Sequence, residues 1–304
     1  MNKALVITYT NLGSLACGFA AWNVLRDQAD YVHQEYQTSF PDLNNYDIVY
    51  LLGYTPTTDE QFKQILDYKN HLVIIDDKNH DTYDRLDKYL NDNADSWADT
   101  KTMNINLHGD SVISSVWEYC NEGFELPKLL KLIEDRHTWK FELQDTKALF
   151  YGMQAYGAGS KYHLWNGIKE SNDLLNFVIQ QGIAVLQYMN IPYHEFINDK
   201  EKFDYCDFIN NGIKYNVLRF VYPYDVSELA ELFLDNNPEI DFVLTIRGLT
   251  RSKSFKHILK SRNNGVNVNE IAKIFGGGGQ PSSAGFILSV EDYDKVNNYF
   301  SNYR

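Results

Sequence analysis

The feature that most limits the possible folds is an alternation of short apolar runs and helical patterns near the N-terminus. Mainly apolar runs occupy residues 4–8 (ALVIT), 47–52 (DIVYLL) and 71–75 (HLVII), with helical patterns at 15–25 and 57–66 between them. Such runs are typical of parallel strands, which helices cover on both faces. The alternation predicts a parallel βαβ sheet whose ligands bind beyond the carboxyl ends of its strands.

Further along the chain the pattern changes. Strand-like runs at 217–222 (VLRFVY) and 241–246 (DFVLTI) enclose a helical segment, and a long apolar helix at 174–188 precedes them. A chain of 304 residues is long enough for two domains. We therefore predict an α/β protein with a larger N-terminal parallel-sheet domain, residues 1–194, and a smaller C-terminal α/β domain, residues 195–304, with a cleft between them.

The composition argues against several classes of protein. The formal charge is −13, with 41 acidic and 28 basic residues, which disfavours a general duplex-DNA or RNA coat. No run of 18 apolar residues is present, so we expect neither a transmembrane helix nor a membrane partner. The three cysteines lie far apart and form no zinc motif, which fits a reducing cytoplasm. We expect a cytoplasmic protein, for which a homodimer stays open.

Four consecutive glycines, Gly276, Gly277, Gly278 and Gly279, follow a predicted helix at 268–274. Glycines allow backbone N–H groups to approach a phosphate closely and to adopt positive φ angles. The run is not a Walker loop, because no Gly-Lys-Ser or Gly-Lys-Thr follows, and it is not a GxGxxG motif. A flexible loop that joins two elements is the alternative interpretation.

The glycine run continues as GGGGQPSSAGF, and the segment ILKS, which contains Lys260 and Ser261, lies upstream and is followed by Arg262. This pattern resembles the C-terminal substrate-binding domain of the DHH phosphoesterases. That family has four glycines, a His, a short spacer and Ala-Ala-Gly-Phe, preceded by Ser-Leu-Arg-Ser. Here Gln280 takes the place of the His, and Lys260 that of the Arg. Gln280 can hydrogen-bond a phosphate or a base but cannot protonate a leaving group.

The first two predicted strands carry further resemblances to this family. The turn after the first strand resembles the His-x-Asp-x-Asp motif, whose positions hold Tyr9, Asn11 and Gly13 here. The position of the Asp that follows the second strand holds Gly53. None of these four residues is the acidic or imidazole ligand that the family uses.

Two acidic segments match the remaining motifs in part. Asp76, Asp77 and Lys78 stand where the Asp-His-His motif would be, after the third predicted strand. The segment EDRHTW resembles the Asp-Arg-Asp-x-Trp segment of the oligoribonuclease-like branch; Asp135 matches there and His137 replaces the second Asp. The resemblance thus covers nearly the whole chain.

The resemblance implies two manganese-type ions, which generate a hydroxide and stabilise the charge on phosphorus. Five of the expected ligands are altered, so we do not expect the bridged pair. Asp76, Asp77 and Asp135 would hold one Mg²⁺ or Mn²⁺ loosely. We therefore expect no cofactor, with Mn²⁺ or Mg²⁺ reserved for an enzymatic alternative.

Three functions stay open. The first is a catalytically inactive protein that sequesters or senses a nucleotide, a cyclic dinucleotide or a short oligonucleotide in the interdomain cleft; in a phage it would counter a host immune nucleotide. The second is a Mn-dependent phosphodiesterase or oligoribonuclease that uses Asp76, Asp77, Asp135 and His80. The third is a structural subunit that contacts a partner. The residues predicted to bind the ligand are Tyr9, Asn11, Lys78, Lys260, Ser261, Arg262, Gly276, Gly277, Gly278, Gly279, Gln280 and Ser282.

Overall fold

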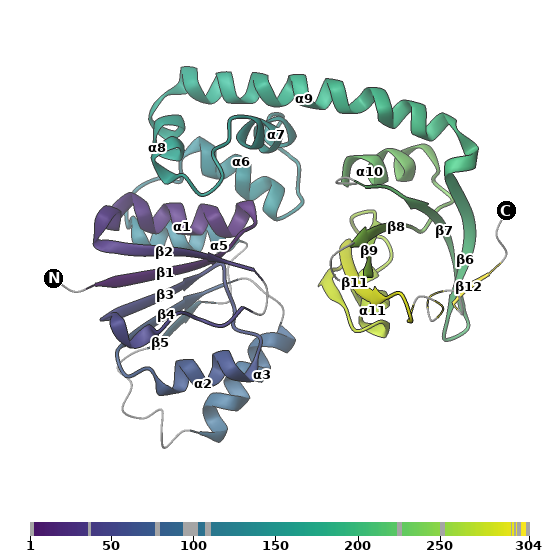
Figure 1. The fold of residues 1–304 in the computed structure, drawn as a ribbon. Helices are drawn as coiled ribbons and strands as arrows, with labels where there is room; N and C mark the ends of the chain where they lie inside the picture. The colour runs from purple at the N-terminus through teal and green to yellow at the C-terminus, as the bar shows by residue number, and fades with distance from the viewer. Residues whose placement is uncertain are drawn as a thin grey trace. The chain divides into compact units, whose positions relative to one another are not determined.

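The structure, a computed structural model, falls into two compact units, Met1–Gln187 and Tyr188–Arg304 (Figure 1). The division lies inside one long helix, α9 (Asn172–Asn198), which also contains the boundary predicted between residues 194 and 195. The predicted α/β class, a larger parallel-sheet unit followed by a smaller unit with its own sheet, is confirmed. The residues described are 3–35, 38–76, 80–93, 103–106, 111–223, 227–249, 253–292, 294, 296 and 299–301.

The N-terminal unit is built on a parallel sheet with the strand order β2-β1-β3-β4-β5. The three strands predicted from the apolar runs are β1, β3 and β4, and they lie next to one another in the sheet. Because all strands run in one direction, their carboxyl ends meet at one edge. The strands are β1 (Ala4–Tyr9), β2 (Ala29–Gln34), β3 (Ile48–Leu52), β4 (His71–Ile75) and β5 (Met103–Asn106).

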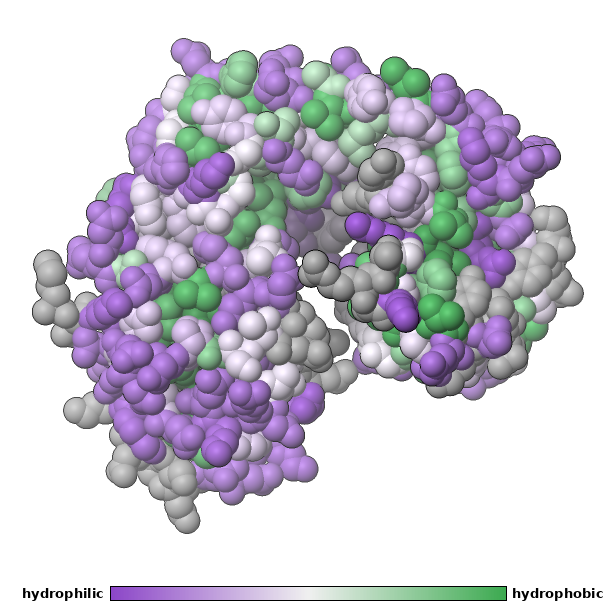
Figure 2. Space-filling model, in the orientation of Figure 1, coloured by the Kyte–Doolittle hydropathy of each residue, from purple (hydrophilic) through white to green (hydrophobic). Residues whose placement is uncertain are grey.

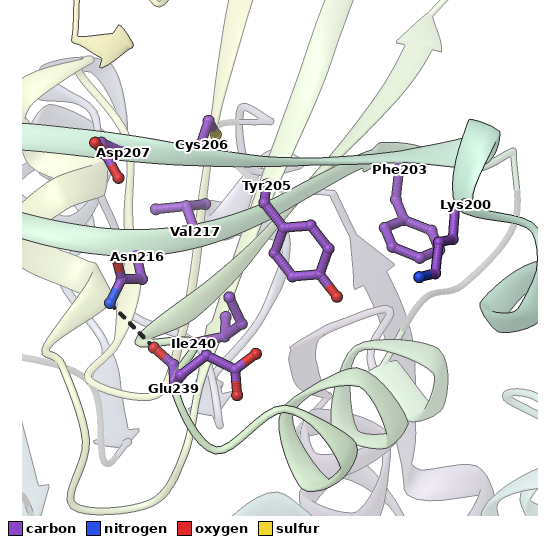
Figure 3. A pocket seen from close by; sticks show the side chains of 9 residues that line it. All are labelled: Lys200, Phe203, Tyr205, Cys206, Asp207, Asn216, Val217, Glu239 and Ile240. Atoms are coloured by element: carbon purple, nitrogen blue, oxygen red, sulfur yellow. Dashed lines mark hydrogen bonds between the residues drawn. The ribbon is translucent and has the colours of Figure 1, made fainter. Parts of the chain in front are cut away.

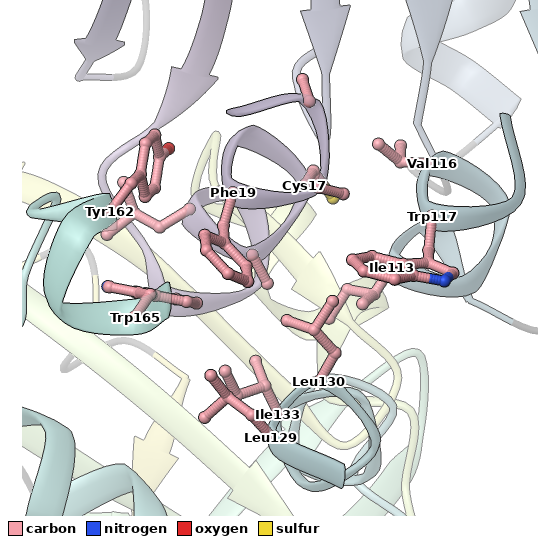
Figure 4. Close-up of a cluster of buried hydrophobic side chains, with 14 of the residues drawn as sticks. Cys17, Phe19, Ile113, Val116, Trp117, Leu129, Leu130, Ile133, Tyr162 and Trp165 are labelled. Atoms are coloured by element: carbon pink, nitrogen blue, oxygen red, sulfur yellow. The ribbon is translucent and has the colours of Figure 1, made fainter. Parts of the chain in front are cut away.

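Different helices cover the two faces of this sheet (Figure 1). Val6 of β1 joins a core formed with α1 and α5 to α9, and Figure 4 shows part of it around Phe19 and Trp165. Leu5 and Ile7, on the opposite face, pack with α2 and α3. The helices are α1 (Leu12–Leu25), α2 (Asp59–Asp67), α3 (His80–Asp92), α5 (Val112–Cys120), α6 (Lys128–His137), α7 (Thr146–Ala155), α8 (Tyr162–Glu170) and α9.

The C-terminal unit has a mixed sheet with the strand order β10-β11-β9-β8-β7-β6-β12. Its strands β7 and β8 are parallel, and the other neighbours are antiparallel. The helix α11 (Val268–Ile274), whose bounds match the predicted helix, packs on one face, and α10 (Ser227–Asn236) packs on the other. The strands are β6 (Phe203–Asn210), β7 (Ile213–Val221), β8 (Phe242–Leu249), β9 (Ser254–Ser261), β10 (Gly278–Gln280), β11 (Ser283–Ser289) and β12 (Phe300–Ser301).

The surface is polar where Figure 2 shows the parallel-sheet unit, at the lower left, in keeping with the formal charge of −13. Single exposed apolar side chains such as Phe124 and Tyr188 are ordinary for a folded protein. In the described part of the chain, no helix combines the length and the apolar character needed to cross a bilayer.

Candidate functional site

The carboxyl end of β1 is closed by aromatic packing and a chain of hydrogen bonds. Tyr9 is 5% exposed, and its ring stacks on Tyr54 with centroids 4.1 Å apart. The Tyr9 hydroxyl donates to the Thr55 carbonyl at 2.8 Å, and the Thr55 hydroxyl donates to the buried carboxylate of Asp76 at 2.5 Å. The structure places the ring of Tyr9 in the core, and the ligand-binding role predicted for it stays a prediction.

The N-terminal turn of α1 contains the next two positions of the first motif, Asn11 and Gly13. Asn11 caps the helix, with its Oδ1 accepting from Ser14 N at 3.0 Å. The next position of the motif, Gly13, lies against His137 at the end of α6. A Cβ built on Gly13 would lie 2.3 Å from His137 Nδ1, far inside contact distance. The imidazole therefore occupies the space that a side chain at this position would need.

Gly53, at the end of β3, adopts a left-handed conformation with φ +57°. Its carbonyl accepts from the Ser14 hydroxyl at 2.8 Å, which ties it to α1. A Cβ here would lie 3.1 Å from Ser14 Cα and 3.2 Å from Cys17 Sγ. An aspartate in this place would be both crowded and strained, because residues other than glycine rarely adopt this φ.

Asp135, in α6, holds the connection to α7. Its carboxylate is 6% exposed and accepts hydrogen bonds from Glu142 N at 2.9 Å, from Leu143 N at 3.1 Å and from the Thr146 hydroxyl. Buried carboxylates with several N–H and O–H donors of this kind are structural anchors. The arrangement gives Asp135 a structural role, and the catalytic or metal-binding role in the alternative prediction stays a prediction.

The glycine run ends α11 and begins an exposed edge. The amides of Gly276 and Gly277 donate to carbonyls in the last turn of α11, each at 3.0 Å, and φ of Gly276 is +74°. This is a common way to finish a helix. The run then forms β10, whose residues are exposed and which, in the described part of the chain, pairs with β11 alone. The run is therefore a helix cap and an edge strand, and the flexible-loop interpretation is wrong.

At three of the four positions, the backbone conformation or the close approach of β11 explains why the residue is a glycine. Gly276 has the positive φ of a helix cap. A Cβ on Gly277 would lie 2.2 Å from a carbonyl oxygen of β11, and one on Gly279 would lie 2.5 Å from an α-carbon of that strand. Gly278 differs, because its φ is not positive and a Cβ there would meet Asn269 Oδ1 at an ordinary distance of 3.7 Å.

Arg262, predicted to contact a ligand, instead closes the end of α10. Its guanidinium donates to the carbonyls of Asn237 at 3.0 Å and Ile240 at 2.6 Å, and also to that of Leu234. Carbonyls at a helix end have no partners within the helix, so the contacts with Leu234 and Asn237 cap α10, and the contact with Ile240 holds the segment that follows. The guanidinium of Arg262 thus has partners within the protein, and the ligand-binding role predicted for it stays a prediction.

The neighbouring predicted residues hold the turn that precedes α11. The Ser261 hydroxyl donates to the Val266 carbonyl at 2.6 Å, and Ser261 N donates to the carbonyl of the half-buried Ser282 at 3.0 Å. Lys260 is 5% exposed within β9, whereas Gln280 is exposed at the end of β10. The structure thus leaves Gln280 as the most accessible of these four side chains, and it buries Lys260.

Two buried polar residues that sequence reasoning passed over lie beside this edge. His257 stacks on Phe286 with centroids 4.6 Å apart, and burial lowers the pKa of its imidazole to about 4. Asn269, in the first turn of α11, is 6% exposed, and its Oδ1 has no hydrogen-bond partner among the described residues. The sequence signal was weak, because an Asn near a helix start usually caps it, and here Asn267 does so.

No known family model matches the chain. A curated relative, the uncharacterized protein R106 of Acanthamoeba polyphaga mimivirus, is 26% identical over 223 residues, which make up 73% of this chain and 51% of that protein. The chain therefore spans about half the length of the curated relative that it matches.

Two solved structures share the arrangement of elements. The pGpG-specific phosphodiesterase PggH of Vibrio cholerae matches with a TM-score of 0.50 and 14% identity over 97% of this chain and 96% of its own. RecJ of Thermus thermophilus, in complex with Mn²⁺, matches with a TM-score of 0.55 and 9% identity over 98% of this chain and 51% of its own. The chain has the fold of the DHH phosphoesterases. The relationship predicted from the glycine motif is thus confirmed for the fold.

The described residues at these motif positions do not fit a DHH centre for two metal ions. His137 fills the place of a side chain at Gly13, Gly53 is left-handed, and the carboxylate of Asp135 is enclosed by its own donors. Within the described ranges, no three His, Cys, Asp or Glu side chains gather so as to hold a metal ion. These contacts add a steric reason to the chemical one for expecting no bridged ion pair, which stays a prediction.

The side chains of three residues with predicted roles are not described by the structure. Asp77 and Lys78 lie outside the described residues. His80 is the first residue of α3, and its side chain is not described. The roles predicted for them stay predictions.

The mixed-sheet unit also contains a hollow of about 540 Å³, lined by residues of β6, β7 and the segment before β8 (Figure 3). Its charged lining is mixed, with Lys200, Asp207 and Glu239, and Asp207 forms an ion pair with Lys214 at 2.8 Å. The glycine run forms β10, at the other end of the strand order. We therefore place the candidate site of this DHH-fold chain at the exposed edge formed by residues 276–280, which we call the glycine edge.

Proposed function

We propose that this chain is a non-catalytic protein with the DHH fold that binds a nucleotide, a cyclic dinucleotide or a short oligonucleotide and holds it uncleaved. The loss of chemistry rests on one observation: the imidazole of His137 occupies the space that a side chain at Gly13 would need. Metal-dependent phosphodiester hydrolysis requires ions that generate a hydroxide and stabilise the charge on phosphorus. Because the residues present do not fit two ions, binding is the function that the frame supports.

The support for a nucleotide ligand comes from the mixed-sheet unit. The strand β10 presents exposed glycine backbone, and the amide of Gln280 beside it can donate to a phosphate or pair with a base. PggH, which shares the fold, is by name specific for pGpG, so linear dinucleotides are the first ligands to test. Sequestering or sensing a signal nucleotide in the cytoplasm would follow, and capture of a host immune nucleotide by a viral protein is a specific case of this proposal.

The test is an incubation in which metal is controlled. The purified chain is mixed with pGpG, pApA, cyclic dinucleotides and mononucleotides, once with Mn²⁺ and once with EDTA. Mass spectrometry follows both product and protein-bound ligand. We expect an intact ligand to be bound under both conditions. Asp76→Asn serves as the control for a residual metal site, since the amide still accepts from the Thr55 hydroxyl while the charge is lost.

Two outcomes would overturn the proposal. Product that requires Mn²⁺ and disappears in Asp76→Asn would establish the alternative, a Mn-dependent phosphodiesterase. Failure to bind any nucleotide in either condition would favour a structural subunit that uses the fold for partner contacts.

A further inference from the structure

The glycine edge contains one position whose lack of a side chain the fold does not explain. Gly276, Gly277 and Gly279 are required by backbone conformation or by the close approach of β11. At Gly278 a Cβ would be tolerated without strain. A bare α-carbon that packing does not need leaves space for something other than the protein's own side chains.

The polar atom beside this bare position is Asn269 Oδ1, 3.7 Å from where a Cβ of Gly278 would lie. It accepts no hydrogen bond from the described residues, although the side chain is more than nine-tenths buried. Buried acceptors are nearly always satisfied, and an unsatisfied one costs folding free energy. The fold therefore holds an acceptor in place that only a partner from outside these residues would satisfy.

The chemistry of this atom limits what the partner can be. An amide oxygen accepts hydrogen bonds and donates none, whereas the oxygens of a phosphodiester at neutral pH are acceptors without a proton to give. A phosphate is thus the wrong partner for Asn269 Oδ1 in the orientation that the amide has in this structure. An N–H donor on a flat group that can lie against a bare α-carbon is the right one, and an exocyclic amino group of a nucleobase has both properties.

We propose that Asn269 Oδ1 and the bare face of Gly278 form a subsite for the exocyclic amino group of a nucleobase. This inference rests on the proposed nucleotide-binding function and assigns the base-recognising part of it. Asn269 Oδ1 is covered in this structure, so binding at this subsite requires the three-residue strand β10, which among the described strands pairs with β11 alone, to shift outward. Gln280, exposed at the end of the same strand, offers a second amide to the ligand.

The experiment compares pApA and pGpG with pIpI, whose inosine bases lack an exocyclic amino group. Affinities are measured by calorimetry on the full chain, with EDTA present. We expect at least one amine-bearing dinucleotide to bind about ten-fold more tightly than pIpI, the factor of a single well-formed hydrogen bond. Asn269→Leu, of similar volume, should remove this preference.

Two glycine variants on the same sheet form a matched pair. Gly278→Val places a side chain over the subsite and should weaken the binding of the preferred dinucleotide about ten-fold. Gly248→Val on β8 is the control, because its φ is also not positive and the nearest atom to its Cβ, in Phe255, is 4.0 Å away. It should leave the affinity unchanged.

The failures are distinguishable. If no dinucleotide binds, the proposed function and this inference both fall. If all three bind with equal affinity, or if Asn269→Leu keeps the preference, the inference falls and the proposed function stands. The thermal unfolding midpoint is a further check, because replacing an unsatisfied buried amide by Leu should not lower it. A lower midpoint would show that the Asn269 side chain is structural and would overturn the inference.

Discussion

The two units differ in how their family-motif positions are packed: those in the first unit are filled, and one in the second is left open. At the carboxyl edge of the parallel sheet, Tyr9 is in the core, His137 fills the space beside Gly13, and Gly53 is locked against α1. In the mixed sheet, by contrast, the glycine run keeps an exposed edge, with one position at Gly278 that packing leaves bare. The comparison teaches that one unit of a chain can fill its motif positions with its own packing while the other leaves such a position uncovered.

The largest expected effect tests whether Asp135 belongs to the structure of the first unit. Asp135→Ala should lower the free energy of unfolding by about 4 kcal/mol, because it leaves donors from Glu142, Leu143 and Thr146 without their charged acceptor. Urea unfolding followed by circular dichroism measures it. Asp145→Ala is the control: its ion pair with Lys128 spans 3.9 Å near the surface, and its loss should cost less than about 1 kcal/mol. Equal losses of stability in Asp135→Ala and Asp145→Ala would contradict the structural role of Asp135.

The next effect tests the steric exchange between Gly13 and His137. Gly13→Ala should destabilise the chain by about 2 to 3 kcal/mol, because the new methyl group would overlap the imidazole. His137→Ala combined with Gly13→Ala should recover most of that loss in a double-mutant cycle. Gly167→Ala in α8 is the helical control, where a Cβ meets Leu174 at 3.5 Å and should be neutral or stabilising. Additive effects at positions 13 and 137 would contradict the contact.

A smaller effect concerns how the stability of the second unit depends on pH. Burial lowers the pKa of His257 to about 4, so its neutral form is favoured in the folded state, whereas the unfolded chain takes up the proton near pH 6.5. The stability from this residue is therefore full above about pH 6.5 and falls as the pH drops toward 4. His257→Phe keeps a ring to stack on Phe286 and cannot titrate. We expect wild type to lose about 2 kcal/mol relative to the variant between pH 7 and 4.5; parallel unfolding curves at the two pH values would contradict this.

The smallest effect concerns the cysteines, which lie in both units. Burial raises the pKa of the Cys120 thiol to about 12 and that of the Cys206 thiol to about 11, so both stay protonated at neutral pH. Thiolate is the reactive form, and we expect slow labelling by a thiol reagent at pH 7.5 in native protein and fast labelling in urea. Rapid native labelling at one site, located by peptide mass spectrometry, would show that its surroundings open readily.

The sequence alone predicts much of the frame, because buried parallel strands leave a strong apolar signal. Strands β1, β3 and β4 and the bounds of α11 were predicted, whereas β2 was missed. This strand forms an edge of the sheet and is only half buried, with Asp30 and His33 in its middle, so its sequence lacks the continuous apolar run of a central strand.

The site was harder to predict, because a sequence shows which groups are present and not what they touch. Arg262 was predicted to bind the ligand, whereas in the structure it donates to three carbonyls in and after the last turn of α10. His137 was matched to the second Asp of the Asp-Arg-Asp-x-Trp segment, and its contact with Gly13, far away in the chain, gave no local signal. The distinction among the four glycines needed the position of β11, which local sequence does not contain.

The helix α9 has a consequence for dividing the molecule into parts. Its first half contributes Leu175 and Val178 to the core of the parallel-sheet unit, and its second half contributes Tyr193 and Phe196 to that of the mixed-sheet unit. A recombinant fragment that begins at residue 195 would leave Tyr193 behind and open a hole under the sheet. A fragment that begins several turns earlier would carry the whole second half of the helix, and with it a complete core, at the cost of an exposed apolar stripe from the first half.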